Sequence, residues 1–330
     1  LKGILPEYGK FVFCNSGTEA VMKSLRIARA VTEKNIIISV TGSWHGSTSE
    51  LLYTNNSKLE NIELSSGLDF NFKKNLKFIP YNDVKRSEII LNKYKKQIMC
   101  VIIEPIQGCL PVDAKKYLTF LNNYCKKNKL LLIFDEMITG LRFNCSSVQS
   151  QFKLKPSIST FGKCFGGGLP IGIIGIKKDI VKKLERKKKK IFFGGTFSGN
   201  SIITYVANET VKFIIKNKKN IFPQIERKAI FLEKTLNSFF NDNNYDAKCY
   251  RFSSMLRIVF SKKEIKNRVQ RDFLEKSKKI NIVKFRNFLF KNNIYLAGNG
   301  IIFLATTTSK KDLSNLTQTI KKAFNQAIIK

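Results

Sequence analysis

The 330-residue chain has little of what most metal sites and membrane segments require. Its single histidine, His45, excludes a His-rich metal site. The seven cysteines are odd in number and form no Cys-x-x-Cys pair, which disfavours a zinc site and favours a cytoplasmic protein without disulfides. No run of about eighteen apolar residues is available for a membrane-spanning helix. The first residues also lack the apolar run and the Ala-x-Ala site of a secretory signal.

Acidic residues are scarce as well. The chain has 24 Asp and Glu against 59 Lys and Arg, which gives a net charge of +35. The excess is mostly lysine and is spread along the whole chain, with its densest run at 187–190. A solvated helix face or loop explains that run better than a nucleic-acid-binding patch, so nucleic acid is not the expected partner.

Continuous apolar runs alternate with amphipathic segments between residues 11 and 176. We expect strands at 11–14, 36–40, 100–103, 130–134 and 171–176 and helices at 19–31, 117–125 and 202–215. Strands that are apolar on both faces, in strand–helix–strand order, predict an α/β fold with a mostly parallel sheet.

The pattern changes from about residue 222 to lysine-rich helices and short strands. We expect a strand at 255–260 and a last helix at 312–328, preceded by a capping box at Ser309 and Asp312. The predicted organisation is a large domain, 1–215, followed by a smaller C-terminal α+β domain, 216–330.

Residues 15–19 lie where an expected buried strand turns into a helix. The hydroxyls of Ser16 and Thr18, the freely approachable backbone of Gly17 and the free N–H groups of the helix suit a phosphate. Ser16 and Glu19 also have the spacing of an ordinary capping box, and this segment alone favours that plainer interpretation.

Three further positions are candidates for chemistry. Asp135 ends an apolar strand at the edge where α/β sheets bind ligands, although it could instead pair with Arg142. Lys163 lies between apolar residues and glycines, where burial would make its amine a nucleophile and base. Trp44 and His45 follow a strand end, where the indole could stack on a planar ligand or simply belong to the core.

In this order the motifs resemble the class III (subgroup II) aminotransferases, which have the fold-type-I architecture of pyridoxal-phosphate enzymes. Within that family the resemblance is greatest to the glutamate-1-semialdehyde 2,1-aminomutases. It rests on residues 13–22, 25–29, 44–46, 80–83, 104–105, 135–136, 139–140, 142, 162–163 and 195–200.

The resemblance implies a role for each motif residue. Lys163 would hold pyridoxal 5'-phosphate (the pyridoxamine form during turnover) covalently and move a proton between carbon atoms, and Asp135 would keep the ring nitrogen protonated. The remaining positions would contact the cofactor: Ser16, Gly17 and Thr18 at the phosphate, Trp44, His45 and Met137 around the ring, and Thr196 from the second subunit of a homodimer. The substrate would be a small, amino-acid-like molecule.

Some positions depart from the family pattern. Apolar Ile138 favours an aminomutase, whereas Gln107 and Gly108 resemble the two-substrate aminotransferases, and Cys109 replaces the usual Asn. Trp44 replaces a Tyr, and Ser201 replaces a Pro. Only fourteen residues precede the Asn15 motif, so we expect the family's N-terminal segment to be missing.

Three functions therefore stay open. The first is an aminomutase that isomerises glutamate-1-semialdehyde to 5-aminolevulinate, and the second is an aminotransferase with a separate donor and acceptor. The third is a basic binding protein on an inactive scaffold, which would bind nucleic acid in a salt-sensitive way and carry no chromophore.

Overall fold

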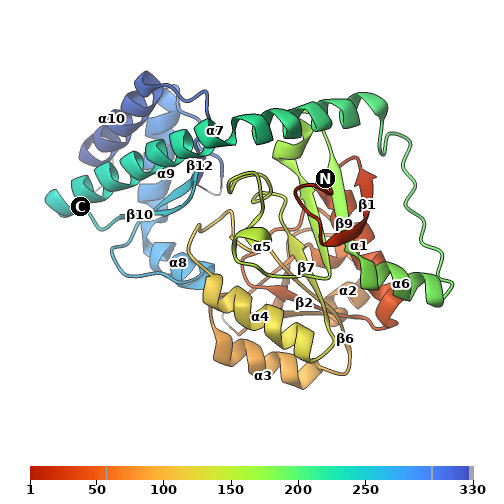
Figure 1. Ribbon diagram of the computed structural model, residues 1–330. Coiled ribbons are helices and arrows are strands. Elements are labelled where there is room, and N and C mark those ends of the chain that lie inside the picture. The colour runs from red at the N-terminus through yellow and green to blue at the C-terminus, as the bar shows by residue number, and fades with distance from the viewer. Residues whose placement is uncertain (57, 299, 327–330) are drawn as a thin grey trace. The chain divides into compact units, whose positions relative to one another are not determined.

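The structure is a computed structural model, and it describes residues 1–56, 58–298 and 300–326. The chain divides into two compact units (Figure 1). The first consists of residues 1–105 and 114–218, and the second of residues 106–113 and 219–330. The boundary predicted after residue 215 falls inside a long helix, α7 (Ser201–Asp242). The division into domains 1–215 and 216–330 stays a prediction.

The first unit is built on a seven-stranded sheet with the order β1-β9-β8-β7-β6-β2-β5 (Figure 1). Strand β9 is antiparallel to both of its neighbours, and the pairings from β8 to β5 are all parallel. The mostly parallel sheet expected from the apolar runs is confirmed. The strands are β1 (Tyr8–Cys14), β2 (Ile36–Val40), β5 (Leu76–Ile79), β6 (Ile98–Ile103), β7 (Leu131–Asp135), β8 (Ile158–Gly162) and β9 (Gly172–Lys177).

The central strands are apolar on both faces because helices cover both faces of the sheet. Every residue of β2, β6, β7 and β8 is buried. The chain crosses the sheet in one direction between β1 and β2 and returns in the other between β5, β6 and β7. Right-handed crossovers therefore place α1 on one face and α3 and α4 on the opposite face. The helices of this unit before α7 are α1 (Gly17–Thr32), α2 (Phe70–Asn75), α3 (Val84–Tyr94), α4 (Lys115–Lys127), α5 (Val148–Gln151) and α6 (Lys178–Arg186).

Helix α1 begins as the capping-box spacing predicts. Ser16 is the N-cap, and its hydroxyl accepts a hydrogen bond from the Glu19 backbone N–H at 3.2 Å. The helix ends at Glu33, which adopts the left-handed conformation. A small hairpin, β3 (Tyr53–Asn55) and β4 (Asn61–Glu63), and two 3₁₀ turns, η1 (Ser49–Leu51) and η2 (Lys163–Gly166), complete this unit before α7.

The second unit contains a three-stranded antiparallel sheet with helices around an aromatic core, as expected for an α+β region. Phe240, Phe285 and Phe324 are fully buried there, and the ring centroids of Phe240 and Phe324 are 4.6 Å apart. The last helix was predicted to reach residue 328, but residues 327–330 lie outside the described part. The elements are β10 (Lys248–Phe252), β11 (Met255–Val259), β12 (Ile301–Phe303), α8 (Arg268–Glu275), η3 (Lys276–Lys278), α9 (Lys279–Lys291) and α10 (Lys310–Gln326).

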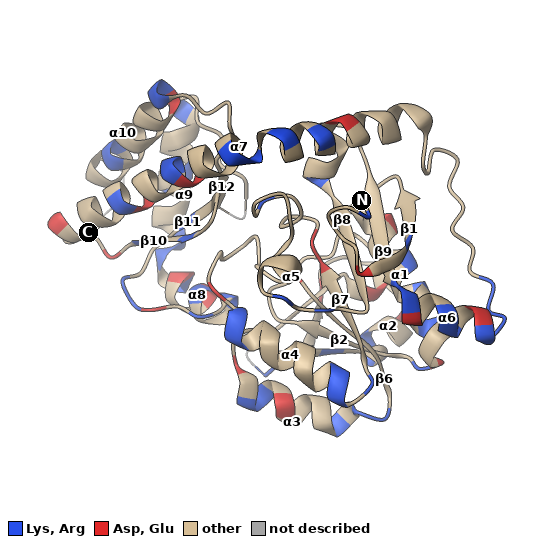
Figure 2. Cartoon of the chain, viewed as in Figure 1, with Lys and Arg blue, Asp and Glu red and all other residues tan. Residues whose placement is uncertain are grey.

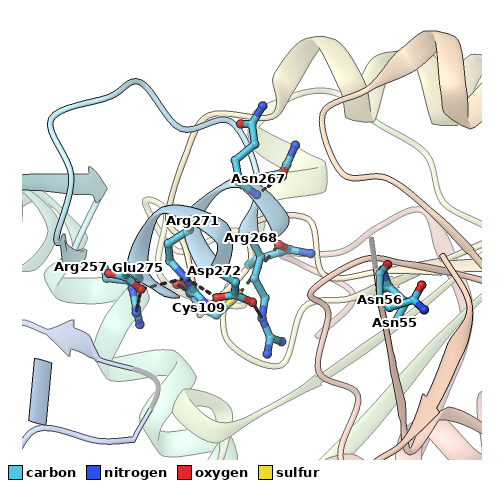
Figure 3. A network of polar contacts seen from close by, with 11 residues as sticks. Asn55, Asn56, Cys109, Arg257, Asn267, Arg268, Arg271, Asp272 and Glu275 are labelled. Atoms are coloured by element: carbon cyan, nitrogen blue, oxygen red, sulfur yellow. Dashed lines mark hydrogen bonds and ion pairs between the residues drawn. The ribbon is translucent and has the colours of Figure 1, made fainter. Parts of the chain in front are cut away.

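A buried ionic network joins β11 to α8 in the second unit (Figure 3). Glu275 Oε2 lies 3.2 Å from Arg257 Nη2 and 3.5 Å from Arg271 Nε. Arg271 also donates to the carbonyl oxygen of Cys109 at 2.5 Å and pairs with the half-exposed Asp272. Two buried guanidinium groups therefore share one buried carboxylate.

Three structural features concern the classes of site considered above. In the described ranges, no helix is long and apolar enough to cross a membrane. The same residues contain no group of three or more His, Cys, Asp or Glu that could hold a metal ion. All seven cysteines are free, and five of them are buried.

Candidate active site

The candidate residues gather at one edge of the large sheet because they follow strands that end there. Parallel strands present their carboxyl ends at the same edge, which is where open α/β sheets bind ligands. Segment 15–18 follows β1, segment 41–46 follows β2, Glu104 follows β6, Asp135 ends β7 and Lys163 follows β8.

The carboxylate of Asp135 is buried and held by three neighbours. Its Oδ1 accepts hydrogen bonds from the Thr160 hydroxyl at 2.9 Å and from the Met137 backbone N–H at 3.2 Å. Its Oδ2 lies 2.8 Å from Nδ1 of His45. Arg142, considered above as an alternative partner of Asp135, donates from Nε to the carbonyl oxygen of Ile138 at 2.6 Å.

His45 brings an available nitrogen to the same place. The contact with Asp135 occupies Nδ1 of the imidazole and leaves Nε2 for another partner. Nε2 is buried and has no hydrogen-bond partner among the described residues. Buried polar atoms are normally paired, so an unpaired one beside a candidate site indicates room for a ligand.

The start of α1, where the sequence predicts an anion site, packs against the loop after β2. The Thr18 hydroxyl lies beside Gly46, where an added Cβ would be 2.3 Å from Thr18 Oγ1. Gly46 has a φ of 76°, which side-chain-bearing residues rarely adopt. Thr18 Oγ1 also accepts from the Ser47 backbone N–H at 3.2 Å. The β2 loop and the start of α1 are thereby held together around the Thr18 hydroxyl.

Met137 packs between two glycines. A Cβ at Gly17 would lie 2.9 Å from the Met137 sulfur, and one at Gly162 would lie 2.7 Å from it. The thioether occupies the space between the ends of β1 and β8, where only glycines leave room for it. Met137 itself is 8% exposed.

Two buried carboxyl groups beside Asp135 had no role assigned from the sequence. Glu104 accepts from the Trp44 backbone N–H at 2.8 Å, and burial raises its pKa to about 7, although His45 and Lys163 act in the opposite direction. Burial also raises the pKa of Glu136 to about 7. Glu136 accepts from the backbone N–H groups of Val148 at 3.0 Å and of Gln149 at 2.8 Å. Glu136 thus ties together the loop that follows Asp135.

Lys163 and Trp44 lie at the predicted edge but differ from expectation in their exposure. The sequence predicts a buried lysine, whereas the Lys163 side chain is exposed. Lys163 follows the last residue of β8 and has a φ of 47°, so it leaves the sheet instead of continuing into the core. Trp44 is 56% exposed and is therefore not a core residue.

Thr196 belongs to an exposed loop, 191–200, that α1 anchors. The buried Lys23 ammonium donates to the carbonyl oxygen of Phe193 at 2.7 Å, and Arg26 donates to that of Phe192 at 2.7 Å. Farther along the loop, a Cβ at Gly195 would lie 3.0 Å from Oε1 of Glu19. The loop therefore follows the first turns of α1, and the Thr196 side chain is exposed.

Comparisons with known proteins identify the family. The family model described as Aminotransferase class-III matches residues 1–324. The chain belongs to the class-III aminotransferases. The glutamate-1-semialdehyde 2,1-aminomutase of Thermodesulfovibrio yellowstonii is 30% identical to it over 99% of this chain and 76% of that protein.

Solved structures share the fold of this class-III aminotransferase. An omega-transaminase from Sphaerobacter thermophilus matches with a TM-score of 0.89 at 19% identity, over 99% of this chain and 76% of that one. A glutamate-1-semialdehyde-aminomutase from Pseudomonas aeruginosa PAO1 in complex with PMP matches with a TM-score of 0.85 at 15% identity, over 98% and 73%. At these identities the likeness concerns the fold alone, and it confirms the fold-type-I architecture.

The site of this class-III aminotransferase fits pyridoxal phosphate, the cofactor of the family. The start of α1, with the Thr18 hydroxyl, suits the phosphate, and the fixed carboxylate of Asp135 suits a protonated ring nitrogen. The unpaired Nε2 of His45 provides a buried polar atom that a ligand can satisfy. Lys163 provides the amine at the same sheet edge. The expected cofactor is thus confirmed at the level of the family.

Proposed function

We propose that this protein is an aminomutase that isomerises glutamate-1-semialdehyde to 5-aminolevulinate. The main support is the 30% identity to an aminomutase over 99% of the chain. In addition, Asp135, His45 and Lys163 lie at one edge of the sheet. Such a reaction moves an amino group between neighbouring carbon atoms of one small substrate. No separate amino donor is then required.

In this proposal Lys163 and Asp135 carry the chemistry. Pyridoxal phosphate, when bound, withdraws electrons from the carbon that carries the substrate nitrogen. The Lys163 amine holds the cofactor and then moves a proton between the two substrate carbons. Asp135 would pair with the ring nitrogen, and Thr160 and the Met137 N–H fix the orientation of its carboxylate.

The neighbouring residues orient the cofactor. Ser16, Gly17 and Thr18 hold the phosphate at the start of α1, where backbone N–H groups and the helix dipole favour an anion. Met137 would contact one face of the ring, and Trp44, whose indole is exposed, would cover the other. His45 keeps Asp135 in place through Nδ1.

We also propose that the protein acts as a homodimer, with Thr196 binding the phosphate in the partner's site. The segment 192–213, which includes Thr196, supports this, because several of its large apolar side chains are exposed and a solvated surface rarely carries so many. They are Phe192 (77%), Phe197 (65%), Ile202 (70%), Tyr205 (68%) and Phe213 (62%). The seven free cysteines support a reducing compartment, the cytoplasm.

A mixed-subunit experiment tests the shared site. Lys163→Ala and Thr196→Val subunits are each expected to be inactive alone. In a mixed dimer one site combines an intact Lys163 with an intact Thr196, so activity should return to roughly half the native value per active dimer if Thr196 acts across the interface. If Thr196 acts within its own subunit, mixing restores nothing.

Substrate turnover tests the proposed reaction. The protein loaded with pyridoxal phosphate is given glutamate-1-semialdehyde without any amino donor, and 5-aminolevulinate is measured. Product should form under these conditions. The competing two-substrate aminotransferase, which Gln107 and Gly108 favour by their resemblance, requires an added donor. Product that appears only after a donor such as alanine is added would refute the aminomutase.

A further inference from the structure

A cavity lies at the opposite edge of the large sheet, away from the candidate active site. It has a volume of about 560 Å³ and is lined in part by Leu131, the first residue of β7, whereas Asp135 is the last residue of that strand. The volume is in the range of small-molecule sites. No residue of the proposed aminomutase site lines this cavity.

The cavity lining is strongly basic. Asp179 is its only acidic residue, so the lining carries a formal excess of five positive charges if all of its lysines are protonated. The lysines come from separate segments of the chain: α4 and its end, the segment before β8, the end of β9, and α6. They are Lys126, Lys129, Lys153, Lys155, Lys177 and Lys183. Figure 2 shows basic residues on both α4 and α6.

The position of Lys177 in this basic lining is energetically unfavourable. Lys177 is half-buried, and its ammonium donates to the carbonyl oxygen of Lys155. Burial lowers the pKa of Lys177, and the charges of Lys155 and Lys126 act in the same direction, against Asp179. A lysine whose ammonium group was simply solvated would extend into water, away from these other positive charges. An anion in the cavity would offset both the burial and the repulsion.

The start of α6 adds backbone donors to the same wall. Lys177 is the N-cap of this nine-residue helix and makes no side-chain capping hydrogen bond. Asp179 and Ile180, in the first turn, both line the cavity. The first N–H groups of a helix have no partner within the helix and favour negative charge. Lysine side chains and helix N–H groups thus face a common space.

We propose that this cavity binds a small ligand that carries two or more phosphate groups. Several cations that converge on a cavity of this size match the closely spaced charges of an oligophosphate better than the single charge of a carboxylate. A cavity suits a compact ligand, whereas a long polynucleotide is bound along a groove that follows its backbone. The ligand can be an inorganic oligophosphate or the phosphate chain of a nucleotide.

Calorimetric titration of the native protein tests the proposal. The probes are sodium tripolyphosphate and adenosine triphosphate without a metal ion, at an ionic strength of about 0.15 M, where contacts between exposed charges are largely screened. Saturable binding with one site per chain is expected for both probes. Equal affinities identify the phosphate groups as the whole ligand, and tighter binding of adenosine triphosphate shows that the nucleoside also contributes.

A matched pair of variants locates the site. Lys126→Gln/Lys183→Gln removes one cavity lysine from α4 and one from α6, and should weaken tripolyphosphate binding by at least about tenfold. Lys127→Gln/Lys182→Gln removes the neighbouring exposed charges from the same helices, outside the lining, and should change affinity by less than about twofold.

Three outcomes would overturn the proposal. The first is that neither probe binds saturably, and the second is that both double variants weaken binding equally. Either result would mean that the cavity binds these anions no better than the rest of the basic surface. The third is binding of single-stranded RNA without binding of tripolyphosphate, which would assign the surface to a polynucleotide. Thermal unfolding of both variants verifies that these exposed substitutions leave the fold intact.

Discussion

Nδ1 of His45 lies 2.8 Å from Oδ2 of Asp135, and both side chains are buried. The pair joins the loop after β2 to the end of β7, two strands that are separated by β6 in the sheet. Thr160 and the Met137 N–H hold the other oxygen of Asp135, so the carboxylate has one orientation before any ligand binds. A charge that is fixed in advance needs no reorganisation during a reaction.

Asp135→Asn should therefore reduce turnover strongly while the protein still binds pyridoxal phosphate. The amide keeps the shape of the side chain but loses the negative charge opposite the ring nitrogen, and the expected loss in kcat is at least about 100-fold. Kinetics at saturating cofactor measure it. Thr160→Val, which removes one hydrogen bond but no charge, should cost less, and an equal loss in both variants would contradict the electrostatic role.

Lys163→Ala should abolish covalent attachment of the cofactor and lower turnover by roughly 10²–10⁴-fold, because the amine that moves the proton is lost. Borohydride trapping followed by mass spectrometry of the native protein should find the cofactor on Lys163. Lys182→Ala, which removes another exposed lysine, should keep the adduct. An adduct on any residue other than Lys163 would refute the assignment.

The sheet and the position of the site follow from local patterns in the sequence. The apolar runs around Ile36 and Leu131 predict strands that are buried on both faces, and the residues after such strands must meet at one edge. Asp135 could therefore be placed at this edge without a structure. Lys163 could not, because the strand that precedes it, β8, was not among the expected strands. The cap of α1 at Ser16 was readable as well, since capping depends on neighbouring residues.

Features that depend on contacts between distant residues could not be predicted. The sequence around Lys163 suggests burial, but the backbone turn after β8 exposes the side chain. The hydrogen bond between Glu104 and the Trp44 backbone N–H joins residues that are 60 positions apart, so no local pattern predicts it. Pairing between Arg257 and Glu275 in the second unit likewise spans a loop and leaves no local pattern.

Gly162→Ala should destabilise the first unit through steric overlap. The added Cβ would lie 2.6 Å from the carbonyl oxygen of Ile171, a backbone atom that cannot move independently, and 2.7 Å from the Met137 sulfur. Overpacking of this kind typically costs about 1–3 kcal/mol. Thermal or urea unfolding measures the loss. Gly3→Ala, where the new Cβ would meet nothing within 4 Å, should be neutral, and similar losses in both variants would contradict the steric explanation.

Glu104 should make the cofactor-free protein less stable as the pH rises. Burial raises its pKa from 4.5 to about 7, so between these values the folded protein holds a proton that the unfolded chain has lost. The free energy of unfolding therefore falls as the pH rises through this window. It levels off above about pH 7, where Glu104 is ionised in both the folded and the unfolded state. Glu104→Gln has no such charge and should be more stable than the native protein at pH 8, by up to about 3 kcal/mol, but not at pH 4.

Unfolding by urea at both pH values measures this difference. Glu33→Gln serves as the control, because Glu33 is exposed and its pairing with Lys189 and Lys187 lowers its pKa instead. That variant should show no gain at pH 8. A Glu104→Gln protein whose stability relative to the native protein is the same at pH 4 and pH 8 would show that folding does not raise the pKa of Glu104.

Glu275→Gln should destabilise the second unit more than any exposed charge change there. Glu275 is the buried carboxylate between Arg257 and Arg271, and its Oε1 also accepts from the Phe260 backbone N–H at 3.2 Å (Figure 3). Without it two buried guanidinium groups lose their shared counter-charge, which costs about 3–5 kcal/mol. Asp272→Asn removes the half-exposed partner of Arg271 and should cost less than about 1 kcal/mol. Denaturant unfolding of the two variants separates these values, and equal losses would mean that water already screens the buried pair.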